Sequence, residues 1–418
     1  MLHILDELEQ RGLVAQSTDP DALRAALDAP LTFYVGFDPT APSLHVGNLL
    51  QLLTARRLQQ AGHKPLLLVG GSTGLIGDPK ESGERVMNSP ETVAAWVDRI
   101  ASQVSRFVDL EGPAAATIVN NLDWTQGLST IDFLRDIGKH FPVNRMVARE
   151  VVSSRLEKGI SYTEFSYVLL QSLDYLELHR RHGCVLQTGG SDQWGNITAG
   201  VELVRRADGA IVHALATPLV TKADGTKFGK TESGTVWLDA ELMSPYAFFQ
   251  FWINAEDAKV GEYLKLFTFL PVDEIDAVVA EHEQNPGLRA AQRRLATEVT
   301  ALVHGQAEVD AAVLASSALF GRGDLASLPE STLAAALREA GAGELPASGS
   351  PTIVDALEAA GLVKSRSEAR RAIAEGGAYV NNERVEDPDL VLGDGHTLHG
   401  SWVVLRRGKR AVSGIRLV

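Results

Sequence analysis

The sequence has a single cysteine and no long hydrophobic run, and each of these absences excludes a class of protein. With Cys184 alone, the chain has no disulfide framework and no cysteine-based structural zinc site, which suits a reducing compartment. No stretch reaches the roughly 18 apolar residues that a membrane-spanning helix needs. The N-terminus places Asp6, Glu7 and Glu9 among scattered leucines, without the cationic start and apolar core of a signal peptide. We therefore expect a soluble, cytoplasmic protein with no membrane partner.

Common motifs for nucleotide and metal chemistry are also missing. The glycines at 70–77 do not have the spacing of a dinucleotide-binding fingerprint. Residues 229–231 resemble the end of a phosphate-binding P-loop, but Asp224 stands where that motif needs a glycine. The eleven histidines show no metal-ligand spacing, and the Gly-x-Ser-x-Gly elbow of acyl-enzyme hydrolases is absent. We therefore expect no tightly bound, protein-ligated metal.

Acidic residues predominate in the chain as a whole but not at its C-terminal end. The 53 Asp and Glu outnumber the 39 Lys and Arg, and the net charge of −14 disfavours non-specific nucleic-acid binding by the whole molecule. Residues 351–418, in contrast, hold ten basic and nine acidic residues, with five of the basic ones in the last thirteen positions. This end could bind a polyanion or could be a solvated surface hairpin, and charge alone leaves both open.

The local patterns predict three parts. Over residues 1–240, short apolar runs alternate with helical segments, which predicts an α/β fold with a parallel sheet covered on both faces. Residues 241–340 are helical in pattern, and the Gly/Pro/Ser/Ala-rich stretch 341–350 indicates a linker. Residues 351–418 predict a small α+β domain. The strands of the first part are expected at 31–37, 65–69, 116–119, 184–187 and 211–214, and its helices at 49–60, 92–108, 130–137 and 163–178.

The segment after the first predicted strand resembles the start of a phosphate-binding helix. It reads FDPTAPSLHVGN, and Ser43 is placed to cap a helix that begins near Leu44. His45 and Asn48 would then share one face of the first turn, where backbone N–H groups and the helix dipole favour phosphate. Gly47 would let a bulky ligand approach the backbone. The alternative is a capping turn with a surface histidine.

A second segment, KADGTKFGKT at 222–231, places two lysines and a hydroxyl in a Gly-rich loop. Lys227, Lys230 and Thr231 suit a developing polyphosphate charge, because a mobile loop can close as that charge builds up. Taken by itself, the segment could equally be a solvated basic loop. The two segments in one chain are far more specific than either alone.

Together, HVGN at 45–48 and KFGKT at 227–231 resemble the HIGH and KMSKS signatures of class I aminoacyl-tRNA synthetases. Three further segments, YVGFDPT at 34–40, GDP at 77–79 and GGSDQWGN at 189–196, are similar to those of the bacterial tyrosyl family. The resemblance covers the whole chain and implies a Rossmann-like catalytic domain, a helical domain that binds the anticodon arm and an S4-like RNA-binding domain. It also implies ATP-dependent activation of L-tyrosine to tyrosyl-adenylate and pyrophosphate, followed by transfer to the 3′-terminal ribose of tRNA(Tyr).

The resemblance implies a tyrosine pocket. Tyr34 and Asp174 would hydrogen-bond the phenolic hydroxyl, while Tyr167, Gln171 and Asp78 would hold the ammonium group. Tyr167, Gln171 and Asp174 are spaced i, i+4 and i+7, so they share one face of a predicted helix, which could otherwise be only its wet side. Phenylalanine would leave the partners of the hydroxyl unpaired, which gives selectivity a physical basis.

The resemblance also implies an ATP site. It places Thr40 and His45 on the leaving pyrophosphate together with Lys227, Lys230 and Thr231, and it places Gly36, Asp38, Gly47, Asn48, Asp192 and Lys230 around the rest of ATP. Asp38 and Gln193 would orient the tyrosine and the α-phosphate. Val35 stands where some relatives carry Cys, so a side-chain contact to the ribose is lost. The tyrosine carboxylate itself attacks the α-phosphorus, and Mg²⁺ is expected on the phosphates rather than in a protein cage.

Further cations are candidates for contacts with pyrophosphate or tRNA: Lys80, Arg85, Arg366, Arg370 and Arg371. Arg366 and Arg370 are four residues apart on one predicted helix, which suggests a phosphate-contact strip, or an exposed helix balanced by Glu368 and Glu375. The resemblance further implies a homodimer formed through the α/β body, with an apolar helix such as 131–137 at the contact.

Two other functions are alternatives to tyrosine activation. A tryptophan-activating relative is disfavoured by the Tyr34/Asp174 pair, which suits a phenolic hydroxyl, and by the S4-like tail. A non-catalytic RNA-binding factor is disfavoured because the phosphate-handling residues are all present: His45, Lys227, Lys230 and Thr231.

Overall fold

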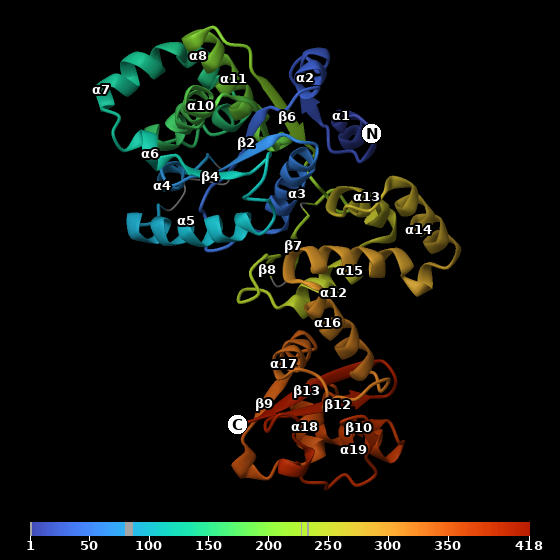
Figure 1. Cartoon of the computed structure of the whole chain (residues 1–418). Helices are drawn as coiled ribbons and strands as arrows, with labels where there is room; N and C mark the ends of the chain where they lie inside the picture. The colour runs from blue at the N-terminus through green and yellow to red at the C-terminus, as the bar shows by residue number, and fades with distance from the viewer. Residues whose placement is uncertain (1, 80–86, 227, 232–233) are drawn as a thin grey trace. The chain divides into compact units, whose positions relative to one another are not determined.

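The structure is a computed structural model that describes residues 2–79, 87–226, 228–231 and 234–418 (Figure 1). The chain forms two compact units, one made of Met1–Leu238 with Glu256–Gln284 and the other of Asp239–Ala255 with Asn285–Val418. The helical segment predicted at 241–340 is thus shared between the two units. Among the described residues, no helix is long and apolar enough to cross a membrane.

The first unit is built on a six-stranded sheet in the order β1-β6-β5-β2-β3-β4. Strands β2 to β6 run parallel, whereas β1 pairs antiparallel with β6 at the edge, with Gln16 opposite Ala216. The predicted α/β class is confirmed, but the sheet is mixed rather than wholly parallel. The strands are β1 (Gln16–Ser17), β2 (Thr32–Phe37), β3 (Lys64–Val69), β4 (Thr117–Asn120), β5 (Cys184–Gly190) and β6 (His213–Thr217).

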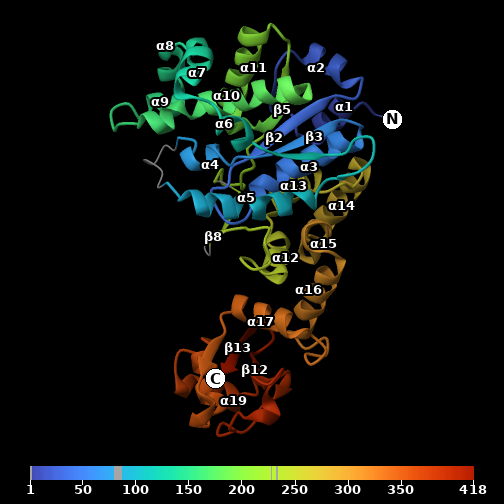
Figure 2. The ribbon, with the colours of Figure 1, turned by 60° about the vertical axis from the view of Figure 1, so that its left-hand side comes forward.

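The order of the strands places a switch point between β2 and β5. From β2 the chain adds β3 and β4 on one side, then returns to add β5 and β6 on the other. Helices α3 (Val46–Gln60) and α5 (Pro90–Ser105) cover one face of the sheet, and α10 (Tyr162–His182) and α11 (Trp194–Asp208) cover the other (Figures 1 and 2). Ligands of such sheets bind beyond the carboxyl ends of the strands at the switch point.

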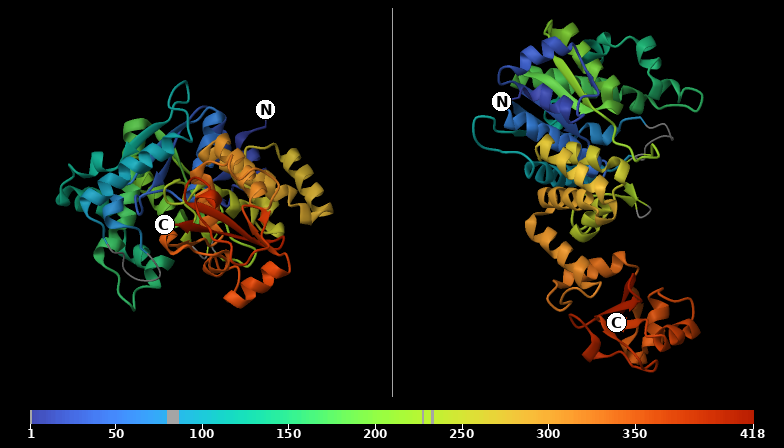
Figure 3. Two further views of the ribbon diagram at one scale, coloured as in Figure 1. Left: turned by 90° about the horizontal axis from the view of Figure 1, so that it is seen from below. Right: turned by 90° about the vertical axis from the view of Figure 1, so that its right-hand side faces the viewer.

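Shorter elements complete the first unit, which Figure 3 shows from two further sides. The segment predicted as a helix at 130–137 has one α-helical turn, Thr130–Asp132, followed by a π-helical stretch, Phe133–Ile137. The other helices are α1 (Ile4–Gln10), α2 (Pro20–Leu27), α4 (Thr73–Ile76), α6 (Leu122–Thr125), α8 (Val143–Val147), α9 (Glu150–Ser153), α13 (Asp257–Phe267) and α14 (Val272–Gln284).

The second unit joins six α-helices, two of which are described below, to a five-stranded sheet in the order β11-β10-β12-β13-β9. Strands β10 and β11 are joined by a tight turn at Asn381-Asn382, and both residues have the positive φ angles that such turns require. The other four helices are α12 (Pro245–Ile253), α15 (Ala290–His304), α16 (Gln306–Ala318) and α17 (Glu330–Glu339), and the strands are β9 (Gly343–Leu345), β10 (Ala378–Val380), β11 (Glu383–Arg384), β12 (Trp402–Arg407) and β13 (Ala411–Leu417).

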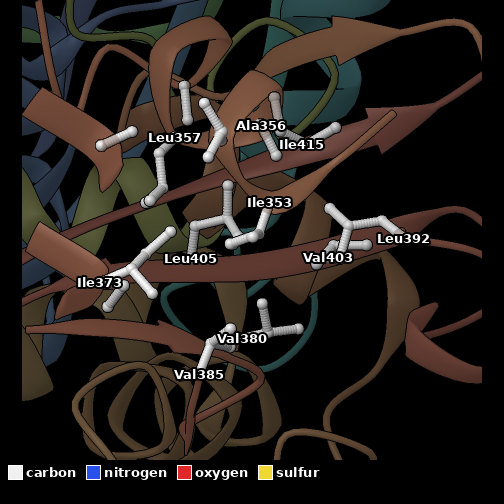
Figure 4. Packing of buried hydrophobic residues seen from close by; sticks show 14 of the residues in the cluster. Ile353, Ala356, Leu357, Ile373, Val380, Val385, Leu392, Val403, Leu405 and Ile415 are labelled. Carbon is white, nitrogen blue, oxygen red and sulfur yellow. The ribbon is translucent and has the colours of Figure 1, made fainter. Parts of the chain in front are cut away.

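A buried apolar cluster holds the C-terminal sheet against α18 (Ile353–Ala359) and α19 (Arg366–Ala374) (Figure 4). Strand β9 lies inside the segment predicted as a linker and pairs in parallel with β13, with Gly343 opposite Ile415. A Cβ at Gly343 would lie 2.5 Å from the Ala359 carbonyl oxygen, so a glycine is required where this strand passes α18. The composition that suggested a linker therefore reflects close packing at this point.

Candidate active site

A cavity of about 330 Å³ lies at the carboxyl ends of β2 and β5, and we call it the β2–β5 cavity. Its walls come from the ends of these strands, the start of α3, one face of α10 and the turn that follows β5. The predicted residues among its lining are Tyr34, Gly36, Asp38, Thr40, His45, Gly47, Asn48, Asp78, Tyr167, Gln171, Asp174, Asp192 and Gln193. Segments that are far apart in the sequence thus meet where the sheet topology places a ligand.

Asp174 and Tyr34 form a deeply buried end of this cavity, each with 1% of its surface exposed. Asp174 accepts hydrogen bonds from Asn121 Nδ2 at 3.0 Å and Trp124 Nε1 at 2.9 Å. Burial nevertheless raises the pKa of Asp174 to about 8. Burial and the Asp174 charge raise the pKa of Tyr34, whose hydroxyl has no hydrogen-bond partner among the described residues. An unpaired buried hydroxyl beside a carboxyl group suits the hydroxyl of a ligand.

A chain of hydrogen bonds connects this end to the middle of the cavity. Asn121 also donates to Thr73 Oγ1 at 2.9 Å, and Thr73 donates to Asp38 at 2.6 Å. Tyr167 donates its hydroxyl hydrogen to the other oxygen of Asp38, also at 2.6 Å. The motifs did not reveal Thr73, Asn121 or Trp124. The signal that could have found them is their position, since each follows the end of β3 or β4.

Acceptor atoms gather at a second place in the cavity. Asp78 accepts from Gln193 Nε2 at 3.0 Å and from Asn196 Nδ2 at 3.2 Å. The buried Oε1 of Gln171 has no hydrogen-bond partner among the described residues. A carboxylate together with an unpaired amide oxygen suits a cationic group such as an ammonium. Gln51, Gln187 and Thr188 also line the cavity and were not predicted.

The residue that caps the start of α3 is not the predicted one. The N-cap is His45, whose Nδ1 accepts from Gly47 N at 3.0 Å, while Asn48 Oδ1 accepts from His45 N at 3.1 Å. The assignment of the cap to Ser43 is wrong, because the buried Ser43 hydroxyl is bonded to Gln103 and to the Leu44 carbonyl. A Cβ at Gly47 would lie 2.9 Å from the His45 ring, which gives this glycine a second role beside ligand access.

The two signature segments lie side by side. Val46 N donates to Val236 O at 3.0 Å, and Gly229 has a φ of 82° and packs on Val46, where a Cβ would come within 2.4 Å. Lys230 and Thr231 form β7 (Lys230–Thr231), which pairs with β8 (Gly234–Thr235). The predicted Lys80, Arg85 and Lys227 lie outside the described residues. The backbone after Phe228 therefore reaches the helix start that carries His45.

The predicted cations of α19 already have acidic partners. Arg366 pairs with Asp355 at 2.9 Å, Arg370 pairs with Asp389 at 3.1 Å, and Arg371 lies 4.0 Å from Glu375. A different set of cations in the second unit lines a cavity of about 940 Å³, which we call the basic cavity. It contains Arg293, Arg322, Arg406, Lys409 and Arg410 together with Phe249, Phe320 and Tyr379. Its described lining includes no Asp or Glu.

In the described part of the chain, no group of three or more His, Cys, Asp or Glu side chains could hold a metal ion.

Two family models match the chain in succession. The model described as tRNA synthetases class I (W and Y) matches residues 26–321, and the model described as tyrosine--tRNA ligase SYY-like C-terminal domain matches residues 340–413. The tyrosine--tRNA ligase of Kineococcus radiotolerans is 62% identical over 417 residues, which is 99% of each chain. That of Acidothermus cellulolyticus is 59% identical over 422 residues, again 99% of each chain.

Solved structures are similar to this chain over about three quarters of its length. The crystal structure of a C-terminally truncated Coccidioides posadasii mitochondrial tyrosyl-tRNA synthetase is 32% identical and has a TM-score of 0.67. The likeness covers 75% of this chain and 91% of that one.

Proposed function

We propose the function of this chain from one premise: it belongs to the class I tRNA synthetases for tryptophan and tyrosine, and within them to the tyrosine--tRNA ligases. It is an aminoacyl-tRNA synthetase that uses ATP as a substrate. It activates L-tyrosine to tyrosyl-adenylate with release of pyrophosphate and then transfers the tyrosyl group to the 3′-terminal ribose of tRNA(Tyr).

The observation that carries the amino-acid assignment is the buried Tyr34 hydroxyl, which has no hydrogen-bond partner among the described residues and lies beside the buried Asp174 carboxyl group in the β2–β5 cavity. The Tyr34 hydroxyl and Asp174 bind the phenolic hydroxyl of tyrosine, and each of these residues has only 1% of its surface exposed. Asp78 and the Gln171 amide oxygen, with Tyr167, bind the ammonium group. Phenylalanine would leave the Tyr34 hydroxyl without a partner, and this costs about 1–3 kcal/mol for a buried polar group.

Catalysis rests on position and charge, because the tyrosine carboxylate is itself the nucleophile toward the α-phosphorus. The start of α3 presents backbone N–H groups and a positive dipole end to the phosphates, next to Thr40 and His45. Lys227, Lys230 and Thr231 act on the leaving pyrophosphate. Gly229 and Val236, which are close to them in the sequence, contact the start of α3. Gly36, Gly47, Asn48 and Asp192 hold the adenosine part, and Asp38 and Gln193 orient the reacting groups. Mg²⁺ is carried on the ATP phosphates.

The second unit supplies the tRNA contacts. Its basic cavity combines five cations with aromatic side chains, and Arg406 lies over the Tyr379 ring at 4.7 Å. Cations of this kind bind the phosphate backbone, and aromatic rings stack with unpaired bases. The first unit thus activates tyrosine, and the second unit makes much of the contact with tRNA. Lys80 and Arg85 are candidates for the pyrophosphate or the acceptor stem, while Arg366, Arg370 and Arg371 would have to exchange their carboxylate partners for phosphates.

The enzyme acts as a homodimer in the cytoplasm. Large apolar side chains are exposed along the segment from α7 (Thr130–Asp132) to the start of α10, among them Ile131 at 68% and Tyr162 at 67%. Figure 2 shows the course of this segment. Val143, Leu134 and Leu156 are exposed in the same segment. Burial of such a patch against a second copy would remove it from water. Light scattering should give the mass of two chains, and Tyr162→Asp combined with Val143→Asp should give that of one.

The experiment that tests the activity is amino-acid-dependent exchange of labelled pyrophosphate into ATP, with tyrosine, phenylalanine and tryptophan compared in the absence of tRNA. Exchange with tyrosine alone is expected. Exchange with tryptophan instead would move the pocket assignment to the sister enzyme, and no exchange from folded protein would contradict the catalytic function.

A further inference from the structure

An arginine outside the predicted site is connected to the acceptors that surround Asp78. Arg149 lies just before α9 and donates a hydrogen bond from Nη2 to Oδ1 of Asn196, in the first turn of α11. Asn196 Nδ2 donates in turn to Asp78 Oδ1 at 3.2 Å and to Gln193 Oε1 at 2.9 Å. Gln193 Nε2 donates to Asp78 Oδ2 at 3.0 Å. Amide donors therefore hold both oxygens of Asp78, and Arg149 anchors the more buried of the two amides, that of Asn196.

The hydrogen bonds from Arg149 through Asn196 to Asp78 all run in one direction, from donor to acceptor. A guanidinium can only donate and a carboxylate can only accept, so Arg149 and Asp78 impose the same orientation on the Asn196 amide between them. Loss of the guanidinium would leave Asn196 Oδ1 without this donor and would release the side chain that holds Asp78 and Gln193 together. Hydrogen bonds in such a chain polarise one another, so a change at one end alters the other.

Gly195 leaves space for Arg149, but the position is electrostatically unfavourable for a cation. A Cβ at Gly195 would lie 3.3 Å from Arg149 Nη2, so the glycine of this segment allows the guanidinium to cross the start of α11. The start of a helix is the positive end of its dipole and an unfavourable place for a cation. Burial also lowers the pKa of Arg149, and the charge of Asp78 opposes that effect. A costly cation held in this position is more readily explained by function than by stability.

We propose that Arg149 is a positioning residue for the amino-acid substrate: through Asn196, it holds Asp78 and Gln193 in the arrangement that binds the ammonium group of tyrosine. This inference rests on the proposed function, in which Asp78 binds that group. It assigns to Arg149 an effect on tyrosine binding that does not depend on tRNA.

The test is pyrophosphate exchange without tRNA, with KM for tyrosine and KM for ATP measured separately. Arg149→Met keeps the length of the side chain but removes its donors, and it is expected to raise KM for tyrosine about tenfold. KM for ATP and kcat should stay within about threefold of the wild type, because the chain of hydrogen bonds ends on Asp78 and Gln193. Arg149→Lys keeps one donor and should recover part of the loss. Arg145→Met is the matched control, because it removes a neighbouring exposed cation that lines the same 220 Å³ cavity as Arg149.

Three outcomes would overturn the inference. A purely structural role would lower the melting temperature of Arg149→Met and leave KM for tyrosine unchanged. A role in tRNA binding would change KM for tRNA in the full aminoacylation reaction and leave the exchange reaction unchanged. An equal rise of KM for tyrosine in Arg145→Met would show that only the loss of charge matters.

Asp78→Asn separates this inference from the function on which it rests. If Asp78→Asn raises KM for tyrosine and Arg149→Met does not, only the inference about Arg149 is wrong. If neither substitution raises it, the assignment of Asp78 is itself wrong. Should Arg149→Met not fold, Arg149→Lys and Asn196→Ala, alone and combined, carry the test. The double variant should then match Asn196→Ala alone, and additive effects would contradict a role exerted through Asn196.

Discussion

Removal of the Tyr34 hydroxyl should weaken substrate selection without weakening the protein. In the structure this hydroxyl is buried next to Asp174 and has no hydrogen-bond partner among the described residues. Tyr34→Phe therefore removes a hydrogen bond that forms only with the substrate. A neutral hydrogen bond contributes about 0.5–1.5 kcal/mol, which corresponds to roughly a 2- to 12-fold loss in the preference for tyrosine over phenylalanine.

The stability of the free enzyme should change in the opposite direction, because a buried polar group without a partner is unfavourable. A gain of about 1 kcal/mol would raise the melting temperature by roughly 2–4 °C in a unit of this size. The assay compares kcat/KM for tyrosine and phenylalanine in pyrophosphate exchange and follows thermal unfolding without ligands. Tyr175→Phe is the matched control, since this buried tyrosine packs edge-on against Tyr34 and donates to the His213 carbonyl at 2.7 Å.

Tyr175→Phe should lower the melting temperature and leave the preference for tyrosine unchanged. The reasoning would be refuted if Tyr34→Phe kept the full preference for tyrosine over phenylalanine. It would also be refuted if that variant lost more than about 1 kcal/mol of unfolding free energy, since the hydroxyl would then have a partner within the free protein.

Three other perturbations have definite expected outcomes. The raised pKa of Asp174, about 8, means that the folded state binds the proton more tightly than the unfolded one, so this group makes the protein less stable as pH rises from about 4 to 8. The melting temperature of Asp174→Asn should therefore rise relative to that of the wild type as pH increases over that range. A difference in melting temperature that does not change with pH would contradict this expectation. Gly229→Ala should lower the exchange rate at least tenfold, because the added Cβ would collide with α3. Gly225 also has a positive φ, 81°, but open space around it, so Gly225→Ala should lower the exchange rate less. Equal losses of exchange rate in the two variants would show that backbone strain alone is responsible. Arg406→Gln should raise KM for tRNA and reduce the salt dependence of that KM without changing the exchange reaction. Arg366 is already paired with a carboxylate, so Arg366→Gln should change KM for tRNA less. A larger effect of Arg366→Gln would exclude the basic cavity as the main tRNA contact.

Features that depend on local sequence were predicted well. The strands at 31–37, 65–69 and 184–187 are present with ends shifted by at most a few residues. The turns at Asn381-Asn382 and Gly408 have positive φ angles, which Asn and Gly tolerate. These features follow from hydrophobic period and from the few residues that tolerate a left-handed backbone, both of which are properties of short segments.

Features that depend on competition between neighbours were predicted less well. Ser43 had the right type and spacing to cap α3, but it is buried against Gln103, and His45 takes the cap instead. Arg366 and Arg370 had the right spacing for a phosphate strip, but carboxylates from other segments pair with them. Sequence alone does not show which partner will be nearest.

By itself, the sequence determined the α/β class, the family and the chemical types of the residues at the ends of β2 and β5. Only the tertiary structure decided how those residues are supported: Asn121 and Trp124 hold Asp174, Thr73 connects Asn121 to Asp38, and Arg149 reaches Asp78 through Asn196. The physical reason is that these hydrogen bonds join residues tens of positions apart. Their partners are set by the packing of helices on the sheet, which no short segment specifies.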